Sequence, residues 1–244
     1  MPAINDSFSV ASIRGHDRGY TAFHSPRYVF LLQLLADLGA SENTRILDVG
    51  RSALTSLIAR RFGARVDSLG LEPDGATNDG AHFRFDLNRA LEEEAWRRDL
   101  PRYDVVVMAE VIEHLHTAPE LVLAFIRTLV ADGGLLVLQT PNAASLPKRI
   151  KLALGRNPYE RIRADASNPG HFREYTANEL RRLAESSGFR TERCRSGYYF
   201  DARYARHRGP ADRPQPVIGT LKNSVYPLLP PTLREGITLV LRRA

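Results

Sequence analysis

The stretch YDVVVMAEVIEHL, residues 103–115, decides the fold class. Its first half is an apolar run of strand length, and three ionisable side chains, Glu110, Glu113 and His114, follow directly. An unbroken apolar run bounded by polar residues is typical of a strand buried on both faces of a parallel sheet. Ligands of such sheets bind beyond the carboxyl ends of the strands. The stretch therefore predicts a buried strand that carries ionisable groups into a ligand site.

Short apolar runs alternate with helical stretches on both sides of this strand. Alternating strands and helices form right-handed crossover units, which produce a mostly parallel sheet covered on both faces. The fold class is therefore doubly wound α/β. The expected strands include RILDV (45–49), ARVDSLGL (64–71), HFRFDL (82–87) and GGLLVLQT (133–140), and the expected helices include 52–62 and 119–130.

Further helices and strands are predicted from local signals. A helix over 26–38 begins near a proline and ends at a glycine, which is the usual asymmetry. Thr117 and Thr176 are each followed three residues later by a glutamate, as in a capping box that begins a helix. Residues 190–199 and 236–243 are expected strands, the second pairing antiparallel at the sheet edge.

The chain is expected to hold one main domain. Residues 1–40 form a polar leader and the first helix, and residues 41–244 form the domain. Within it, residues 141–175 are rich in Pro, Asn, Gly and Arg and are expected to form a lid-like insertion that binds a ligand. Residues 200–232 are expected to form an irregular basic tail before the last strand.

The charge balance is basic. The 244 residues include 34 Lys and Arg against 28 Asp and Glu, for a net charge of +6 and a pI of about 9.7. Basic residues gather in the insertion and the tail, with no RNA-binding module or aromatic array beside them, so a small anionic ligand is favoured over a nucleic acid. These are Lys148, Arg149, Lys151, Arg156, Arg161, Arg163, Arg203, Arg206 and Arg208.

The chain also indicates a location. Cys194 is the single cysteine, so no internal disulfide can form, and no apolar run reaches the length of a membrane span. The polar first twenty residues do not resemble a secretory signal. We expect a cytoplasmic protein without a transmembrane segment; the sequence does not indicate its oligomeric state.

Two clusters can carry chemistry. Asp48 and Gly50 end the first strand, where they either bind a ligand or only shape the turn. In the second cluster His114 can act as a general base, or Glu110, Glu113 and His114 can surround a divalent ion. The alternative is that Glu113 and His114 make local hydrogen bonds that shape the turn.

Five motifs in a fixed order resemble the class I S-adenosylmethionine-dependent methyltransferases. The resemblance covers roughly residues 26–189 and is greatest to the ubiquinone-biosynthesis O-methyltransferases and many bacterial glycan and natural-product methyltransferases. It implies a seven-stranded Rossmann-like methyltransferase fold and S-adenosylmethionine as cofactor. The motifs are ILDVG (46–50), FRFDL (83–87), YDVVVMAEVIEHLH (103–116), LVADGGLLVLQTPN (129–142) and HFREYTANELRRLAESSGF (171–189).

The resemblance also implies roles for individual residues. Arg27, Asp48 and Gly50 match positions that reach or wrap the methionine part of the cofactor. The positions that contact the adenine or line the cofactor through backbone are matched by Asp86, Leu87, Met108 and Ala109.

Metal and acceptor positions are matched as well. Glu110, Glu113 and His114 match a Glu-x-x-Glu-His set that binds magnesium in some relatives, which makes magnesium an optional cofactor. His171, Arg173 and Tyr175 match the box that flanks the acceptor pocket.

The chain departs from the family pattern in two places. After Gly50 the usual later glycines are replaced by Arg51, Ser52, Ala53 and Leu54, which puts approach of the cofactor in question. At the end of the second strand, where an acidic residue normally binds the ribose, alignment places a glycine at residue 70. The candidate is then Glu72, two residues later, unless that glutamate is only a solvent-facing turn charge.

Methyl transfer to oxygen needs alignment of donor and acceptor and removal of the acceptor's proton. The leading hypothesis is therefore an O-methyltransferase acting on a small molecule or a glycan, with His114 or His171 as catalytic base. One alternative is a methyltransferase-like binding or scaffold protein, which is favoured if Arg51 or Leu54 fills the cofactor cleft. A second alternative is an RNA methyltransferase.

Overall fold

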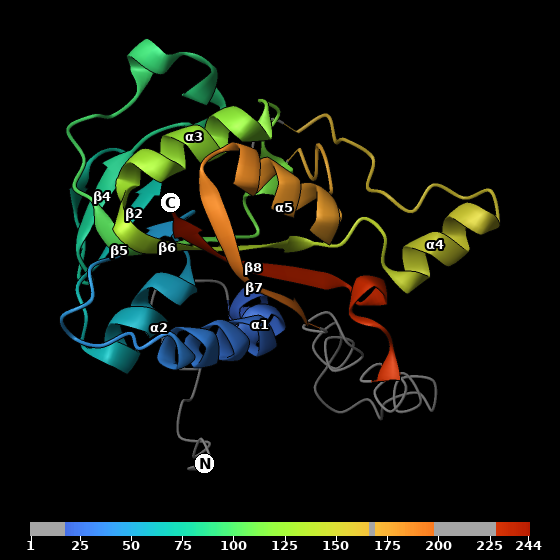
Figure 1. The fold of residues 1–244 in the computed structure, drawn as a ribbon, viewed down its shortest axis with the longest axis horizontal. Coiled ribbons are helices and arrows are strands. Elements are labelled where there is room, and N and C mark those ends of the chain that lie inside the picture. Colours follow the sequence, from blue (N-terminus) through green and yellow to red (C-terminus); the bar gives the residue numbers. More distant parts are fainter. Residues whose placement is uncertain (1–17, 166–168, 198–227) are drawn as a thin grey trace.

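The computed structural model describes residues 18–165, 169–197 and 228–244, which form one mixed sheet between two layers of helices (Figure 1). The strand order is β3-β4-β2-β1-β5-β6-β8-β7. The strands are β1 Ile46–Val49, β2 Val66–Gly70, β3 Gly75–Ala76, β4 Ala81–Arg84, β5 Tyr103–Ala109, β6 Val130–Pro141, β7 Phe189–Gly197 and β8 Gly236–Arg243.

The sheet is doubly wound, as predicted, but it has eight strands instead of seven. The extra strand is β3, only two residues long and antiparallel to β4. From β4 through β2, β1 and β5 to β6 all neighbours are parallel. The prediction that the last strand lies at the edge was wrong, because β8 lies between β6 and β7 and is antiparallel to both. Most of β8 is buried, whereas β7 has the largely exposed pattern of an edge strand.

Four helices cover the two faces of the sheet. Helices α1 and α2 lie on one face, and α3 and α5 lie on the other (Figure 1). Helix α4 stands away from the sheet, at the right of the view. The helices are α1 Arg18–Asp37, α2 Ala53–Phe62, α3 Pro119–Leu129, α4 Leu146–Ala153 and α5 Ala177–Ser186.

Two helix starts differ from the prediction. Helix α1 begins at Arg18, so Pro26 is inside it; beyond that proline, buried side chains such as Leu31 and Leu35 hold the helix against the sheet. Helix α3 has Ala118, not Thr117, as its N-cap, with no side-chain cap. At α5 the predicted capping box of Thr176 is confirmed.

The core is split by the sheet. On β5, Val105 and Val107 pack with α1 and α2, whereas Val106 and Met108 pack with α3 and α5. This alternation is the period of two expected of a strand. All four side chains are nearly or fully buried, so β5 is fixed from both sides and its carboxyl end is held firmly in place.

The insertion at 141–175 contains α4 and irregular chain, and its role as a lid stays a prediction. Most of the predicted tail at 200–232 lies outside the described residues, as do Arg203, Arg206 and Arg208. Within the described parts of the chain, none of the helices has the length and apolar character needed to cross a membrane.

Candidate active site

The site lies at the carboxyl ends of β1 and β5, where the strand order reverses. Gly50 follows β1 with φ of 81°, and its N–H donates to the Leu69 carbonyl oxygen at 2.9 Å. A Cβ at Gly50 would lie 2.8 Å from Cγ2 of Val111, which follows β5. A side chain is therefore excluded both by the left-handed backbone and by this close approach. The crevice at this reversal is where α/β sheets bind ligands.

Asp48 is held under this turn by hydrogen bonds within the loop that lacks the later glycines. Its carboxylate accepts a hydrogen bond of 2.6 Å from the Thr55 hydroxyl. Ser52 is the N-cap of α2, and it forms a capping box with Thr55. Burial raises the pKa of Asp48 to about 7, although the Thr55 hydrogen bond and the charge of Arg27 oppose that rise. Sequence reasoning missed Thr55, whose signal was its place three residues after a serine N-cap.

Of the two residues named by the scaffold alternative, Leu54 does not fill the cleft. The Arg51 side chain is exposed. Leu54 is 2% exposed and packs in the core between the sheet and the α1–α2 layer. Leu54 therefore contributes to the core of the fold.

The remaining residues matched to cofactor positions lie along the same edge. Glu72 follows β2, is largely exposed, and its carboxylate lies 3.4 Å from Nε2 of His82. Asp86 follows β4 and accepts a hydrogen bond of 2.9 Å from the Asn88 N–H, so it caps a short 3-10 helix. The side chain of Met108 is fully buried, which leaves only its backbone for a ligand. The neighbouring positions are Leu87, which is buried, and Ala109, which is half-buried.

Arg27 reaches the edge from α1 and places a positive charge among three carboxyl groups. It is 3% exposed, and its charge lowers the pKa values of Asp48, Glu110 and Glu113 against the larger effect of burial, which raises all three. Glu110 has φ of 58°, and it is the only described residue other than glycine with a positive φ. Such conformations gather at functional sites.

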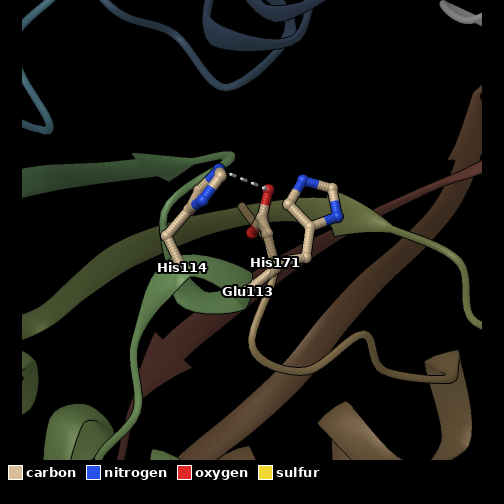
Figure 2. Close-up of side chains that lie close together, drawn as sticks. All are labelled: Glu113, His114 and His171. Atoms are coloured by element: carbon tan, nitrogen blue, oxygen red, sulfur yellow. Dashed lines mark ion pairs between the residues drawn. The ribbon is translucent and has the colours of Figure 1, made fainter. Parts of the chain in front are cut away.

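Glu113, His114 and His171 come together beside this edge (Figure 2). The rings of His114 and His171 lie edge to face, with centroids 4.8 Å apart. The two segments are joined by backbone, since the Phe172 N–H donates to the Glu113 carbonyl oxygen at 2.8 Å. The Glu113 side chain is fully buried, with Oε2 accepting a hydrogen bond of 2.9 Å from the Thr140 hydroxyl. Its Oε1 has no hydrogen-bond partner within the described parts of the chain.

Each imidazole is held through Nδ1. Nδ1 of His114 lies 2.9 Å from the Gly170 carbonyl oxygen, and Nδ1 of His171 lies 3.2 Å from a carboxylate oxygen of Glu174. Because a carbonyl or carboxylate oxygen accepts, Nδ1 carries the proton in both rings and Nε2 of the neutral ring carries the lone pair. Nε2 of His114 lies 4.0 Å from Oε1 of Glu113, the contact dashed in Figure 2, which is too long for a hydrogen bond. Both rings can therefore accept a proton.

A small cavity opens beside the imidazole pair. It measures about 270 Å³ and is lined by His171, Glu174, Lys148, Lys151 and several prolines. Lys148 comes from α4 and forms an ion pair with Glu174. Burial lowers the pKa of Lys148 to about 8 and, together with the charge of His114, that of His171 to about 4. His171 is therefore neutral at pH 7. Sequence reasoning missed both Lys148 as a site residue and Glu174.

Arg173 and Tyr175, which the sequence matched with His171 to the acceptor-pocket box, have structural roles. Tyr175 is 1% exposed, and burial raises its pKa to about 12. The guanidinium of Arg173 lies over that ring and pairs with Glu179 at the start of α5. They hold the box against the body of the fold and do not face the cavity.

The residues do not fit magnesium. The group with ligand atoms within 4.8 Å of one another is Glu113, His114 and His171, which offers one carboxylate and two imidazoles. Glu110, predicted as a ligand, is outside that group. Magnesium prefers oxygen ligands in octahedral geometry, whereas imidazole suits transition metals. The magnesium prediction is therefore not supported, and no step of the proposed chemistry passes through a metal.

The chain was compared with known proteins. The methyltransferase domain family matches residues 23–193. A relative from Mycolicibacterium smegmatis, described as a probable S-adenosylmethionine-dependent methyltransferase, is 33% identical over 153 residues, which is 59% of this chain and 53% of the relative. The match thus spans about half the length of that curated relative.

Solved structures share the fold. An S-adenosylmethionine-dependent methyltransferase from Archaeoglobus fulgidus superposes with a TM-score of 0.55 at 14% identity, over 93% of this chain and 100% of that one. Magnesium protoporphyrin IX methyltransferase from Synechocystis with bound S-adenosylhomocysteine gives 0.55 at 12% identity, over 96% and 91%. The family match shows that the chain belongs to the methyltransferase domain family, and its fold is that of the class I S-adenosylmethionine-dependent methyltransferases.

Proposed function

We propose that this protein transfers the methyl group of S-adenosylmethionine to a hydroxyl oxygen of a small-molecule or glycan acceptor in the cytoplasm. The observation that carries the proposal is the imidazole pair of His114 and His171. It joins the edge of the sheet at β1 and β5 to the cavity of about 270 Å³. That volume suits a small molecule or one sugar unit of a larger acceptor.

The donor lies at the carboxyl edge in this proposal. Arg27, Asp48 and Gly50 contact its methionine part, with Gly50 contributing only its backbone, since Val111 occupies the space that a side chain would need. Glu72 accepts hydrogen bonds from the ribose hydroxyls, since it follows the strand next to β1. The adenine and the rest of the cleft are contacted by Asp86, Leu87, Met108 and Ala109.

The bound donor supplies an electrophilic methyl group on a sulfonium. This chain's residues align the acceptor in the cavity and remove its proton. Nε2 of His114 or His171 accepts the hydroxyl proton as the oxygen–methyl bond forms and the sulfur–methyl bond breaks, which leaves S-adenosylhomocysteine and an imidazolium. Glu174 keeps the proton of His171 on Nδ1, so Nε2 has a lone pair that can accept the hydroxyl proton.

The cavity is lined by two lysines and by two glutamates, Glu174 and Glu235, and Lys151 is the cation that favours an acceptor with an anionic group. Lys148 and Lys151 both line it, and Lys148 is already paired with Glu174. Lys151 is exposed at the rim, where a carboxylate or phosphate of the acceptor can pair with it.

The test is methyl transfer from donor labelled in the methyl group to a panel of acceptors. Hydroxyl compounds with and without a carboxylate or phosphate are compared with matching amines. We expect label in the hydroxyl compounds, and more in the anionic ones. Label only in amines, or in mixed RNA, would contradict the proposal.

A further inference from the structure

Exposed apolar side chains are concentrated in one short part of the chain. Among the described residues, nine large hydrophobic side chains are well exposed, and five of them lie between residues 150 and 162. We call residues 149–163 the basic-apolar segment. Its exposed apolar members are Ile150 (50%), Leu152 (51%), Leu154 (68%), Tyr159 (41%) and Ile162 (53%).

None of the residues of helix α4 is fully buried: Leu146, Pro147 and Lys148 at its start are half-buried, and the rest of the helix is exposed. Leu146, Ile150, Ala153 and Leu154 follow the spacing of one helical face, at i, i+4, i+7 and i+8. An apolar stripe with no core to cover needs another apolar surface. In Figure 1 α4 stands out from the sheet and its covering helices, so the described body of the fold leaves most of this stripe uncovered.

The same segment is strongly cationic. It contains five basic residues and one acidic residue, Glu160, and all of them are exposed. A surface that combines exposed aliphatic side chains with cations is complementary to anionic lipid headgroups above acyl chains. The phosphates of a nucleic acid would pair with the cations, but they would leave the aliphatic side chains exposed to water. The basic residues are Arg149, Lys151, Arg156, Arg161 and Arg163.

We propose that the basic-apolar segment docks this protein onto the surface of an anionic lipid bilayer. Ile150 and Leu154 enter the boundary between headgroups and acyl chains, and Arg156 and Arg161 lie at the level of the headgroups. The docked surface is continuous with the site, because Lys148 of α4 is tied to Glu174, which contacts His171. The cavity then opens beside the bilayer. The docking itself does not depend on the proposed methyl transfer.

The experiment is flotation of the full-length protein with vesicles. Vesicles of phosphatidylcholine alone are compared with vesicles that also contain phosphatidylglycerol, at low and at physiological salt. We expect binding to the anionic vesicles only, weakened by salt. Ile150→Ser with Leu154→Ser should weaken it about tenfold or more, because both side chains leave an apolar environment.

A matched control tests whether the effect depends on where the exposed apolar side chains lie. Val29 and Leu91 are 50% and 68% exposed, like Ile150 and Leu154, and they lie far from α4 in the chain. Val29→Ser with Leu91→Ser should leave vesicle binding unchanged.

The charges have a control of their own. Arg156→Gln with Arg161→Gln should weaken binding about tenfold. The same change at the exposed Arg181 and Arg182 of α5 should have little effect. Because all these side chains are exposed, we expect unfolding curves that match the wild type, and these confirm that each variant is folded.

Three results would overturn the inference. The first is absence of binding to anionic vesicles. The second is vesicle binding that Ile150→Ser with Leu154→Ser leaves intact, or binding of the protein to mixed RNA in place of vesicles that this variant leaves intact. The third is a dimer of the wild type in solution that the same variant dissociates, since the stripe would then be covered by a second copy of this chain.

Discussion

The imidazole rings of His114 and His171 lie edge to face at 4.8 Å, although α3, β6 and α4 separate the two residues in the chain. The hydrogen bond from the Phe172 N–H to the Glu113 carbonyl oxygen joins their segments. The pair therefore stands where the carboxyl edge of the sheet meets the small cavity.

The imidazole pair should be needed for transfer but not for donor binding. We expect His114→Asn and His171→Asn each to lower kcat for a hydroxyl acceptor. In the variant that lacks the catalytic base, kcat should fall about 100-fold or more, because asparagine cannot accept the proton. Affinity for S-adenosylhomocysteine should stay within about twofold of the wild type, because neither ring forms the Gly50 turn.

Both quantities can be measured on the same preparations. His116, an exposed neighbour with its ring against Phe172, provides the control, and His116→Asn should leave kcat unchanged. Wild-type kcat in both variants of the pair would remove the imidazoles from the mechanism.

Gly50 should tolerate no side chain. Gly50→Ala meets both a φ of 81° and a contact of 2.8 Å with Val111, and we expect it to lower the free energy of unfolding by about 2–4 kcal/mol. Gly39 has a φ of 84°, but a Cβ added there would meet no atom within 4 Å, so Gly39→Ala should cost only about 1 kcal/mol.

Urea denaturation measures both costs. Adding Val111→Ala to Gly50→Ala removes the contact but not the strain, so part of the loss should be recovered. Equal costs at the two glycines would show that the close approach at β1 and β5 is unimportant.

Stability should depend on pH through Asp48. Burial raises its pKa from the usual 3.8 to about 7, so between these values the folded chain holds a proton that the unfolded chain has lost. The contribution of Asp48 to the free energy of unfolding should therefore fall by about 4 kcal/mol as pH rises from about 4 to 7, then level off.

The difference between wild type and Asp48→Asn isolates this effect, since Glu110 and Glu113 are present in both. Urea denaturation at several pH values provides it. A difference that stays constant, or that grows as pH rises, is the opposite of what burial of this carboxyl group requires.

Magnesium should not be needed. The group of Glu113, His114 and His171 provides a single carboxylate and two imidazoles, one of which is the base in the proposed mechanism. We expect the rate of methyl transfer to be the same with added magnesium as with a chelator. A loss of activity in the chelator that magnesium restores would disprove this interpretation of the cluster.

Sequence patterns were enough for the parallel half of the sheet. The strands at 45–49 and 103–109 were recognisable because each is an apolar run buried on both faces. The position of β8 was not, because its place between β6 and β7 depends on pairing with distant chain. The start of α1 was missed because tertiary contacts beyond Pro26 outweigh the local cost of a proline.

The site was predictable in its parts and not in its arrangement. Asp48, Gly50, His114 and His171 were found from local motifs, yet nothing local indicates that the two imidazoles touch. Glu174 lies inside a recognised box, but its contacts with His171 and Lys148 require the folded insertion.

The most direct test of donor binding is calorimetric titration of folded protein with S-adenosylhomocysteine, the product that the donor becomes. The loop from Gly50 to Leu54 lacks the later glycines, but Ser52 and Thr55 hold Asp48 beneath the Gly50 turn. We predict binding of one molecule per chain, and weaker binding by Gly50→Ala at a temperature where that variant is still folded. No heat of binding and no thermal stabilisation of the wild type would contradict the account.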